Sequence, residues 1–256
     1  GKVGGGKEPC LDNLGHGSVV LNERNKLVAV LGSGAFGTVY ASLQPEGRCA
    51  AVKVQRAGEK YAQVTLDEIE LLRRVAAARE DAAKHGDMKG GDCVVELLET
   101  FSLPGAKKQM CLSFEMLGPS LLDLIIDFGY SGIPVQTVKR LALHALKGLD
   151  FLHSQCGIIH TDVKPENVLL SLPEAGLQAM PSTGIPAWWA KNSLHNKQGA
   201  RKLRPGWTWS LETAQLGAKL VDLGNSCLEL HHYSEKIQTI EYRSPEVVIG
   251  SGYGTP

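Results

Sequence analysis

The sequence predicts an α+β protein of two lobes, the first rich in strands and the second mainly helical. Strand-like runs dominate up to about residue 117, and helical periodicity dominates after Gly118. Strands and helices grouped in separate runs are typical of α+β folds. Of 256 residues, 43% are hydrophobic and 21% charged, enough for one large domain or two small lobes. We place the boundary near Met116–Pro119, with the lobes over 26–117 and 118–256.

The first lobe follows a Gly-rich, polar lead-in over residues 1–25. Its strand-like runs, rich in apolar and β-branched residues, lie at 26–40, 48–55, 93–102 and 109–117. The first of these runs contains a glycine-rich turn, so it predicts strand, loop and strand. Residues 65–78 have the helical spacing of Leu66, Ile69 and Leu72, and the charged, Gly-containing stretch 80–92 predicts a loop.

The second lobe opens with a short helix over 119–127 and a long one over 134–154, whose apolar residues repeat with a period of 3.6. Residues 171–216 read as an insert of low order, with several prolines, all four tryptophans and a basic run. That basic run is either a solvated face or a binding signal. A strand around Lys219–Val221 follows the insert.

Charge and cysteine usage set limits on partners. Lys plus Arg and Asp plus Glu each number 27, so no global field favours nucleic acid or a membrane surface. No apolar run reaches the roughly 18–20 residues of a membrane span. Six cysteines form no C-x-x-C pair, and Cys49 and Cys111 lie in strand-like runs where a buried, reduced thiol is expected. This usage favours a reducing compartment.

One stretch, residues 160–167, reads His-Thr-Asp-Val-Lys-Pro-Glu-Asn. The carboxylate of Asp162 can orient a nucleophilic hydroxyl, and Lys164 can neutralise a phosphoryl oxygen. The amide oxygen of Asn167 can hold a metal ion. These are the groups that phosphoryl transfer requires, and the spacing H-x-D-x-K-x-x-N matches the catalytic loop of protein kinases.

A glycine-rich loop lies far upstream, where Gly32, Gly34 and Gly37 form G-x-G-x-x-G. Thr38-Val39-Tyr40 follows, so a strand is expected after the loop, whereas a dinucleotide-binding fingerprint would continue as a helix. Such a hairpin lets backbone N–H groups close over phosphates. The alternative is an ordinary Gly-rich hairpin turn.

Lys53 stands in the middle of an apolar strand, where a buried ammonium needs a partner. It either faces outward on a half-exposed strand or pairs with ATP phosphates and a glutamate, for which Glu68 is the candidate. Thr65-Leu66-Asp67-Glu68 can also be read as a capping box with Thr65 as the cap. The ion pair is favoured if the helix begins before Thr65.

Two more motifs follow. Asp222-Leu223-Gly224 comes after a strand, where its carboxylate could bind Mg²⁺, although an Asp-containing turn is the plainer reading. Ser244-Pro245-Glu246 is uninformative alone. The decisive observation is the order of all the motifs, which is the order expected of a protein kinase. Leu223 and Ser244 depart from the usual Asp-Phe-Gly and Ala-Pro-Glu.

Roughly residues 20–256 resemble the serine/arginine-rich protein kinases. The resemblance rests on these runs: LDEIELL (66–72), SFEMLGPSLLDLI (113–125), GLDFLHSQCGIIHTDVKPENVLL (148–170), VDLGNSC (221–227) and IQTIEYRSPEVVIGSGYGTP (237–256). It implies a two-lobed protein-kinase-like fold that transfers the γ-phosphate of Mg²⁺–ATP to Ser or Thr of Arg/Ser-rich protein substrates. It also implies nuclear or cytoplasmic localisation.

The resemblance implies a role for each matching residue. Asp162 would accept the substrate proton, Lys164 would steady the γ-phosphate, and Asn167 and Asp222 would hold Mg²⁺. Lys53, paired with Glu68, would fix the α- and β-phosphates. Nucleotide contacts would come from Leu31, Gly32, Ser33, Gly34, Ala35, Phe36, Gly37, Val39, Ala51, Phe114 (the gatekeeper), Glu115 and Leu117. His160, Leu223 and Leu72 would pack in a spine that links the lobes.

Two departures from the family pattern bear on function. Thr161 stands where many kinases have an Arg that pairs with a phosphorylated activation loop, so we expect activity without such phosphorylation. Ile240 stands where these kinases usually have Arg, so recognition next to the acceptor is expected to differ.

Because the chain ends ten residues after Glu246, we expect an incomplete second lobe and low stability. The alternative function is an ATP-binding scaffold without turnover. We expect a monomer, with no nucleic-acid or membrane partner.

Overall fold

A computed structural model describes residues 19–103, 109–171 and 216–255. The lead-in predicted over 1–25 and the insert predicted over 171–216 lie mostly outside these residues. The described chain forms two compact units: the first has residues 19–65, 97–103 and 109–116, and the second 66–96, 117–171 and 216–255. One unit is built on a sheet and the other mainly on helices, which confirms the α+β class. The lobe limits themselves stay predictions.

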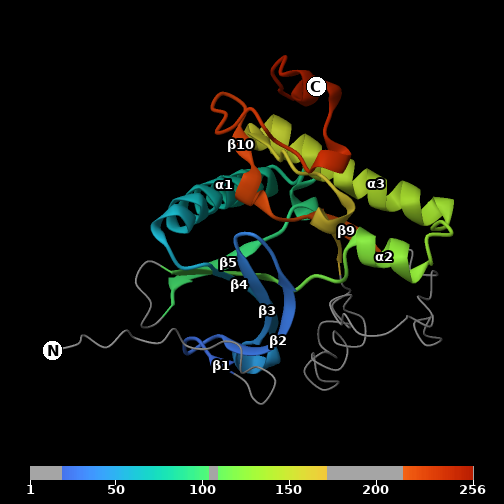
Figure 1. Cartoon of the computed structure of the whole chain (residues 1–256). Helices are drawn as coiled ribbons and strands as arrows, with labels where there is room; N and C mark the ends of the chain where they lie inside the picture. Colours follow the sequence, from blue (N-terminus) through green and yellow to red (C-terminus); the bar gives the residue numbers. More distant parts are fainter. Residues whose placement is uncertain (1–18, 104–108, 172–215, 256) are drawn as a thin grey trace. The chain divides into compact units, whose positions relative to one another are not determined.

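The first unit is an antiparallel sheet in the order β1-β2-β3-β4-β6-β5 (Figure 1). Its strands are β1 Val19–Val20, β2 Lys26–Ser33, β3 Gly37–Leu43, β4 Cys49–Gln55, β5 Leu97–Ser102 and β6 Met110–Glu115. The prediction of a strand directly after the glycine-rich loop is confirmed by β3. The strand predicted over 93–102 begins only at Leu97, because Gly91–Cys93 form a 3-10 turn.

The strand register of this sheet separates two faces. Directly paired residues share a face, and successive residues alternate between faces. One face buries an apolar cluster of Leu21, Leu27, Tyr40, Val52, Val54, Leu103 and Cys111. On the other face Val39 pairs with Lys53, and Ala51 pairs with Phe114. These four residues, all predicted to contact a nucleotide, therefore stand opposite the core, whereas Glu115 pairs with Ala50 on the core face.

Helix α1 spans Glu59–Lys84, longer at both ends than the predicted 65–78. Thr65 is buried inside it, so the capping-box interpretation is wrong. Thr65 shares a buried stripe with Ile69, Leu72 and Val75, and packing of that stripe outweighs the weak helix preference of β-branched residues. Part of the loop predicted over 80–92 is likewise helical.

The second unit contains α2 Leu121–Asp127, α3 Val135–Asp150 and α6 Pro245–Ile249. A capping box starts α2: Asp123 N donates to Ser120 Oγ at 3.1 Å, and Ser120 N donates to Asp123 Oδ2 at 3.0 Å. Helix α3 continues as a π-helical turn and ends at Gly157, which has a left-handed backbone. These elements confirm the two predicted helices.

Two short strand pairs complete the second unit: β7 Ile158–Ile159 with β10 Cys227–Leu228, and β8 Val168–Ser171 with β9 Gly217–Leu220. Helix α3 packs against β9 (Figure 1). A side chain at Gly148 would come within 3.0 Å of Leu220, so this glycine allows the close approach. The strand predicted around Lys219 is confirmed by β9.

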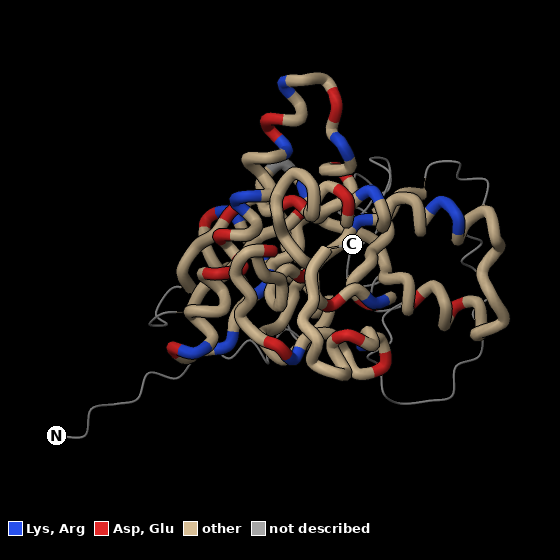
Figure 2. The backbone as a smooth tube through the Cα atoms, turned by 90° about the horizontal axis from the view of Figure 1, so that it is seen from above, with Lys and Arg blue, Asp and Glu red and all other residues tan. Residues whose placement is uncertain are grey.

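Charges of both signs are interspersed along the described backbone (Figure 2). Within the described ranges the five cysteines are free thiols, and no helix is long and apolar enough to cross a membrane. Burial raises the pKa of the Cys111 thiol to about 12, so it remains protonated.

Candidate active site

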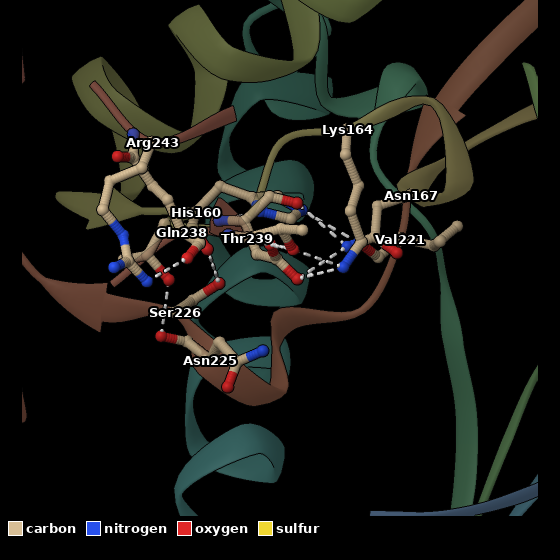
Figure 3. A network of polar contacts seen from close by, with 11 residues as sticks. His160, Lys164, Asn167, Val221, Asn225, Ser226, Gln238, Thr239 and Arg243 are labelled. Carbon is tan, nitrogen blue, oxygen red and sulfur yellow. Dashed lines mark hydrogen bonds and ion pairs between the residues drawn. The ribbon is translucent and has the colours of Figure 1, made fainter. Parts of the chain in front are cut away.

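Asp162 is the acceptor of a polar network in the second unit. Figure 3 shows Lys164, Asn167 and Thr239, which belong to this network. Lys164 Nζ donates to Asp162 Oδ2 at 2.8 Å, and Thr239 Oγ1 donates to Asp162 Oδ1 at 2.7 Å. The Thr239 backbone N–H also donates to Oδ1 at 3.1 Å, and Lys164 Nζ reaches Thr239 Oγ1 at 2.8 Å. The ammonium, the hydroxyl and the carboxylate thus form a closed triangle.

The charge state of Asp162 follows from this network. Burial raises the pKa of its carboxyl, but the hydrogen bonds from Lys164 and Thr239 and the charge of Lys164 together lower that pKa below its ordinary value. Asp162 is therefore a carboxylate at neutral pH. A carboxylate held by fixed donors can orient a hydroxyl and accept its proton.

Asn167 and Asp222, the predicted metal ligands, belong to this unit. Asn167 Nδ2 donates to Asp162 O at 2.9 Å, so the amide oxygen of Asn167 points the other way and can serve as a hard oxygen ligand for a metal ion. Asp222 and Glu68 both lie beside Gly224. A β-carbon at Gly224 would come within 3.2 Å of Asp222 Oδ1 and 3.4 Å of Glu68 Oε2. Among the described residues no three His, Cys, Asp or Glu gather as a metal cluster. An amide oxygen with one carboxylate fits Mg²⁺, which takes few protein ligands and retains waters.

His160 is fully buried and connects two backbone segments. Its Nε2 lies 3.0 Å from Val221 O, and its Nδ1 lies 3.3 Å from Asp162 N. A carbonyl only accepts and an amide only donates, so the ring is the neutral tautomer that carries its proton on Nε2. Burial also lowers the pKa of His160 below its ordinary value, which favours the same neutral form. Leu223 and Leu72 are equally buried, but the spine predicted from these three residues stays a prediction.

Two non-glycine residues of this site have left-handed backbone. Thr161 has φ of 64° and Asp222 has φ of 65°, conformations that cost of order 1–3 kcal/mol each. Thr161 Oγ1 donates to Asn225 O at 2.7 Å, and Ser226 Oγ donates to His160 O at 3.0 Å. These bonds join Asn225 and Ser226 to residues 160–161 (Figure 3).

Residues 237–244 form a second network that the sequence did not point to. Arg243 donates from Nε to Ile237 O at 3.0 Å and from Nη2 to Gln238 O at 2.9 Å. Ser244 N donates to Gln238 Oε1 at 2.7 Å, and Gln238 has φ of 68°. Thr239 follows directly, so these contacts help to place its hydroxyl. Ile240, expected to affect recognition, is exposed.

The glycine-rich loop lies in the first unit, between β2 and β3. Gly34 N donates to Gly37 O at 2.9 Å and closes the turn. Arg56 reaches over from the end of β4 and donates from Nη2 to Gly34 O at 3.1 Å. A side chain at Gly37 would overlap the Val54 carbonyl oxygen, whereas one at Gly32 or Gly34 would meet no atom within 4 Å. Gly37 is therefore a packing glycine, while the other two leave open space above the loop.

Lys53 is partly buried in β4, on the sheet face of Val39, Ala51 and Phe114. Glu68 is only 3% exposed on α1, a level at which a carboxylate requires a partner. Because α1 begins before Thr65, the condition that favours the Lys53–Glu68 ion pair is met. The pair itself stays a prediction, as do the hinge contacts of Glu115 and Leu117.

Comparison with known proteins identifies the family. The family model of the protein kinase domain matches residues 26–256. Serine/threonine-protein kinase SRPK of Physarum polycephalum is 34% identical over 253 residues, covering 92% of this chain and 58% of that protein. Protein kinase dsk1 of Schizosaccharomyces pombe is 30% identical over 312 residues, with coverage of 88% and 56%.

SRSF protein kinase 3 of Homo sapiens is 36% identical over 163 residues, covering 63% of this chain and 28% of that protein. The chain therefore spans less than two thirds of the length of each of these relatives. A domain match over nearly the whole chain, together with these relatives, shows that it belongs to the protein kinase family, among the serine/arginine-rich protein kinases.

Proposed function

We propose that this chain carries the catalytic residues of a serine/threonine kinase that transfers the γ-phosphate of Mg²⁺–ATP to Arg/Ser-rich proteins. The single observation that supports this most is the triangle of Asp162, Lys164 and Thr239. In it the ionised carboxylate of Asp162 is fixed by the ammonium of Lys164 and the hydroxyl of Thr239. The printed name of SRSF protein kinase 3 supports the choice of substrate class.

Asp162 orients the acceptor hydroxyl and takes up its proton as the phosphoryl group moves. The contact from Asn167 Nδ2 to Asp162 Oδ2 is long, at 3.4 Å, so an incoming hydroxyl can take its place. Lys164 lies 2.8 Å from the same carboxylate and is close enough to face a phosphoryl oxygen that gathers charge. Catalysis by these residues is positioning and charge neutralisation.

Asn167 and Asp222 would hold Mg²⁺, which supplies charge neutralisation between the phosphates when it is bound. In the first unit the open space above Gly32 and Gly34 suits phosphates that bind backbone N–H groups. Lys53 would bind the α- and β-phosphates, and Val39 and Ala51 would pack on the adenine ring. Phe114, the predicted gatekeeper, would limit how deeply the adenine ring inserts.

The second candidate function is an ATP-binding scaffold without turnover. Large apolar side chains on α3 are exposed, including Val135 at 66% and Leu146 at 63%. Apolar groups at this density on one helix are usually covered by another element. A chain whose second unit has such a face could bind nucleotide without holding Asp162 rigidly enough for catalysis.

Phosphorylation of an Arg-Ser repeat peptide separates the two functions. The wild-type chain should transfer phosphate from Mg²⁺–ATP to the peptide. Asp162→Asn should reduce the rate of this transfer by about 10²–10⁴, the contribution of a positioned acid–base group. Equal incorporation by both proteins would remove Asp162 from the mechanism. Nucleotide binding without incorporation by the wild-type chain would support the scaffold.

The same assay tests regulation, since Thr161 offers no cation to an activation-loop phosphate. Treatment of an active preparation with phosphatase should leave the rate unchanged. Loss of activity after that treatment would show that a phosphate elsewhere in the chain is required.

A further inference from the structure

Two short backbone segments run side by side, one ahead of Asn167 in the chain and the other after Asp222. Ile158–Ile159 pair with Cys227–Leu228 as antiparallel strands. Beyond this ladder, Thr161 Oγ1 donates to Asn225 O at 2.7 Å and Ser226 Oγ donates to His160 O at 3.0 Å. Each segment thus gives one hydroxyl to a carbonyl of the other, and we refer to these two hydrogen bonds as the clasp.

The two donors of the clasp are buried, with Thr161 6% exposed and Ser226 4% exposed. The bond from Ser226 to His160 lies in the interior, so removal of the Ser226 hydroxyl leaves the His160 carbonyl without a donor and without water to replace it. The bond from Thr161 is partly buried, because its acceptor residue Asn225 is exposed.

One residue of strained backbone belongs to the clasp, Thr161, and another, Asp222, lies three residues before Asn225. Thr161 and Asp222 both have φ near 65°, a region that residues with a β-carbon seldom occupy, and Thr161 is β-branched as well. Such conformations persist only where surrounding contacts over-determine them, and they gather at functional sites. A relaxation of Asp222 to negative φ would turn its carboxylate to a different direction.

We propose that Thr161 and Ser226 are positioning residues whose clasp keeps Asp222 in the conformation that binds Mg²⁺. The inference rests on the proposed function, and it gives Thr161 a role of its own. In kinases with an Arg at this position, an ion pair to a phosphorylated loop orders the segment. Here two neutral hydrogen bonds with buried donors order it, and no modification is required.

The test is nucleotide affinity of the full chain, measured by calorimetry with Mg²⁺ and again with EDTA. Thr161→Val removes the hydroxyl and keeps the shape, Ser226→Ala removes the other hydroxyl, and Thr161→Ser restores the first. Mg²⁺ should increase ATP affinity by a factor that is about tenfold smaller in Thr161→Val and in Ser226→Ala than in the wild type. A tenfold change corresponds to roughly one hydrogen bond. Affinity in EDTA should stay unchanged, and Thr161→Ser should match the wild type.

The controls separate this inference from the proposed function. If Mg²⁺ does not increase the ATP affinity of the wild-type chain, the proposed function is wrong. If Mg²⁺ increases it equally in the wild type and both clasp variants, the clasp is wrong. If Thr161→Val does not fold, the ratio of ATP affinity with Mg²⁺ to ATP affinity with EDTA in Ser226→Ala decides. A loss that is equal with and without Mg²⁺ would indicate general destabilisation and would also overturn the inference.

Discussion

The first unit carries most of its candidate site residues on regular strands, apart from the glycine-rich loop, whereas the second carries them mostly on irregular backbone. Lys53, Ala51 and Phe114 stand at paired positions of a sheet, so strand register alone decides which face they occupy. Asp162 and Asp222 lie in loops, and hydrogen bonds between side chains and backbone hold these loops, such as Thr239 N to Asp162 Oδ1 and Thr161 Oγ1 to Asn225 O. A ladder thus positions residues through pairing, while a loop must be held by contacts at each position.

The two units also differ in how they bury apolar surface. The sheet of the first unit covers a contiguous cluster around Leu27 and Val52, both fully buried. Helix α3 of the second unit buries Leu141 but exposes Val135, Val138, Leu143 and Leu146. The second unit has its own buried side chains, such as Phe151 and Leu152, so the contrast lies between the buried sheet face of the first unit and the exposed face of α3. The following predictions test that contrast.

The largest effect is expected from Leu27→Ala. Removal of a fully buried leucine loses transfer free energy and leaves a cavity, so the free energy of unfolding should fall by about 2–5 kcal/mol. Leu146→Ala is the matched control on α3, and it should change that free energy by no more than about 0.5 kcal/mol. Denaturant unfolding of both variants measures the difference. A large loss for Leu146→Ala would mean that another surface covers this face.

Gly37→Ala should have the next largest effect. The added carbon would overlap the Val54 carbonyl oxygen, so strands β3 and β4 must shift at a cost of about 1–3 kcal/mol. Gly34→Ala meets no atom within 4 Å and should leave stability unchanged while it weakens ATP binding. Thermal melting with and without ATP checks both variants. Equal melting temperatures for the two would refute the distinction between a packing glycine and a phosphate-contacting one.

The smallest effect concerns pH. Burial lowers the pKa of His160 below 6.5, so the unfolded chain binds a proton where the folded chain does not. The contribution of His160 to stability is complete above about pH 6.5 and is lost as pH falls through its folded pKa. His144 and His153, whose pKa values are also lowered by burial, act in the same direction.

The free energy of unfolding should therefore decrease below about pH 6.5, by at most about 1.4 kcal/mol per pH unit for His160. Denaturant unfolding between pH 5 and 7 measures this slope, and His160→Asn should make it shallower. An unchanged slope in that variant would show that His160 does not titrate as described. Asp162, whose pKa is lowered from 3.8, affects stability only in a lower pH range.

Much of this molecule could be predicted from periodicity and motif order, because strands and long helices depend on local patterns. The glycine-rich loop, the β-strand that carries Lys53 and helix α3 are examples. The start of α1 could not be predicted, since packing overrides the local capping signal at Thr65. Thr239 could not be predicted either, because its contact with Asp162 joins residues 77 positions apart and no short motif records it.

The hydrogen bonds of Asp162 have a consequence for the energy of substrate binding. Its two carboxylate oxygens accept from four donors: Thr239 N, Thr239 Oγ1, Lys164 Nζ and Asn167 Nδ2. Four is about the capacity of a carboxylate, so the group needs no hydration shell. Its dehydration is accomplished when the chain folds and need not be repeated when a substrate arrives. In the proposed function, an acceptor hydroxyl would exchange one protein donor for itself, and the surrounding dipoles would need little reorganisation.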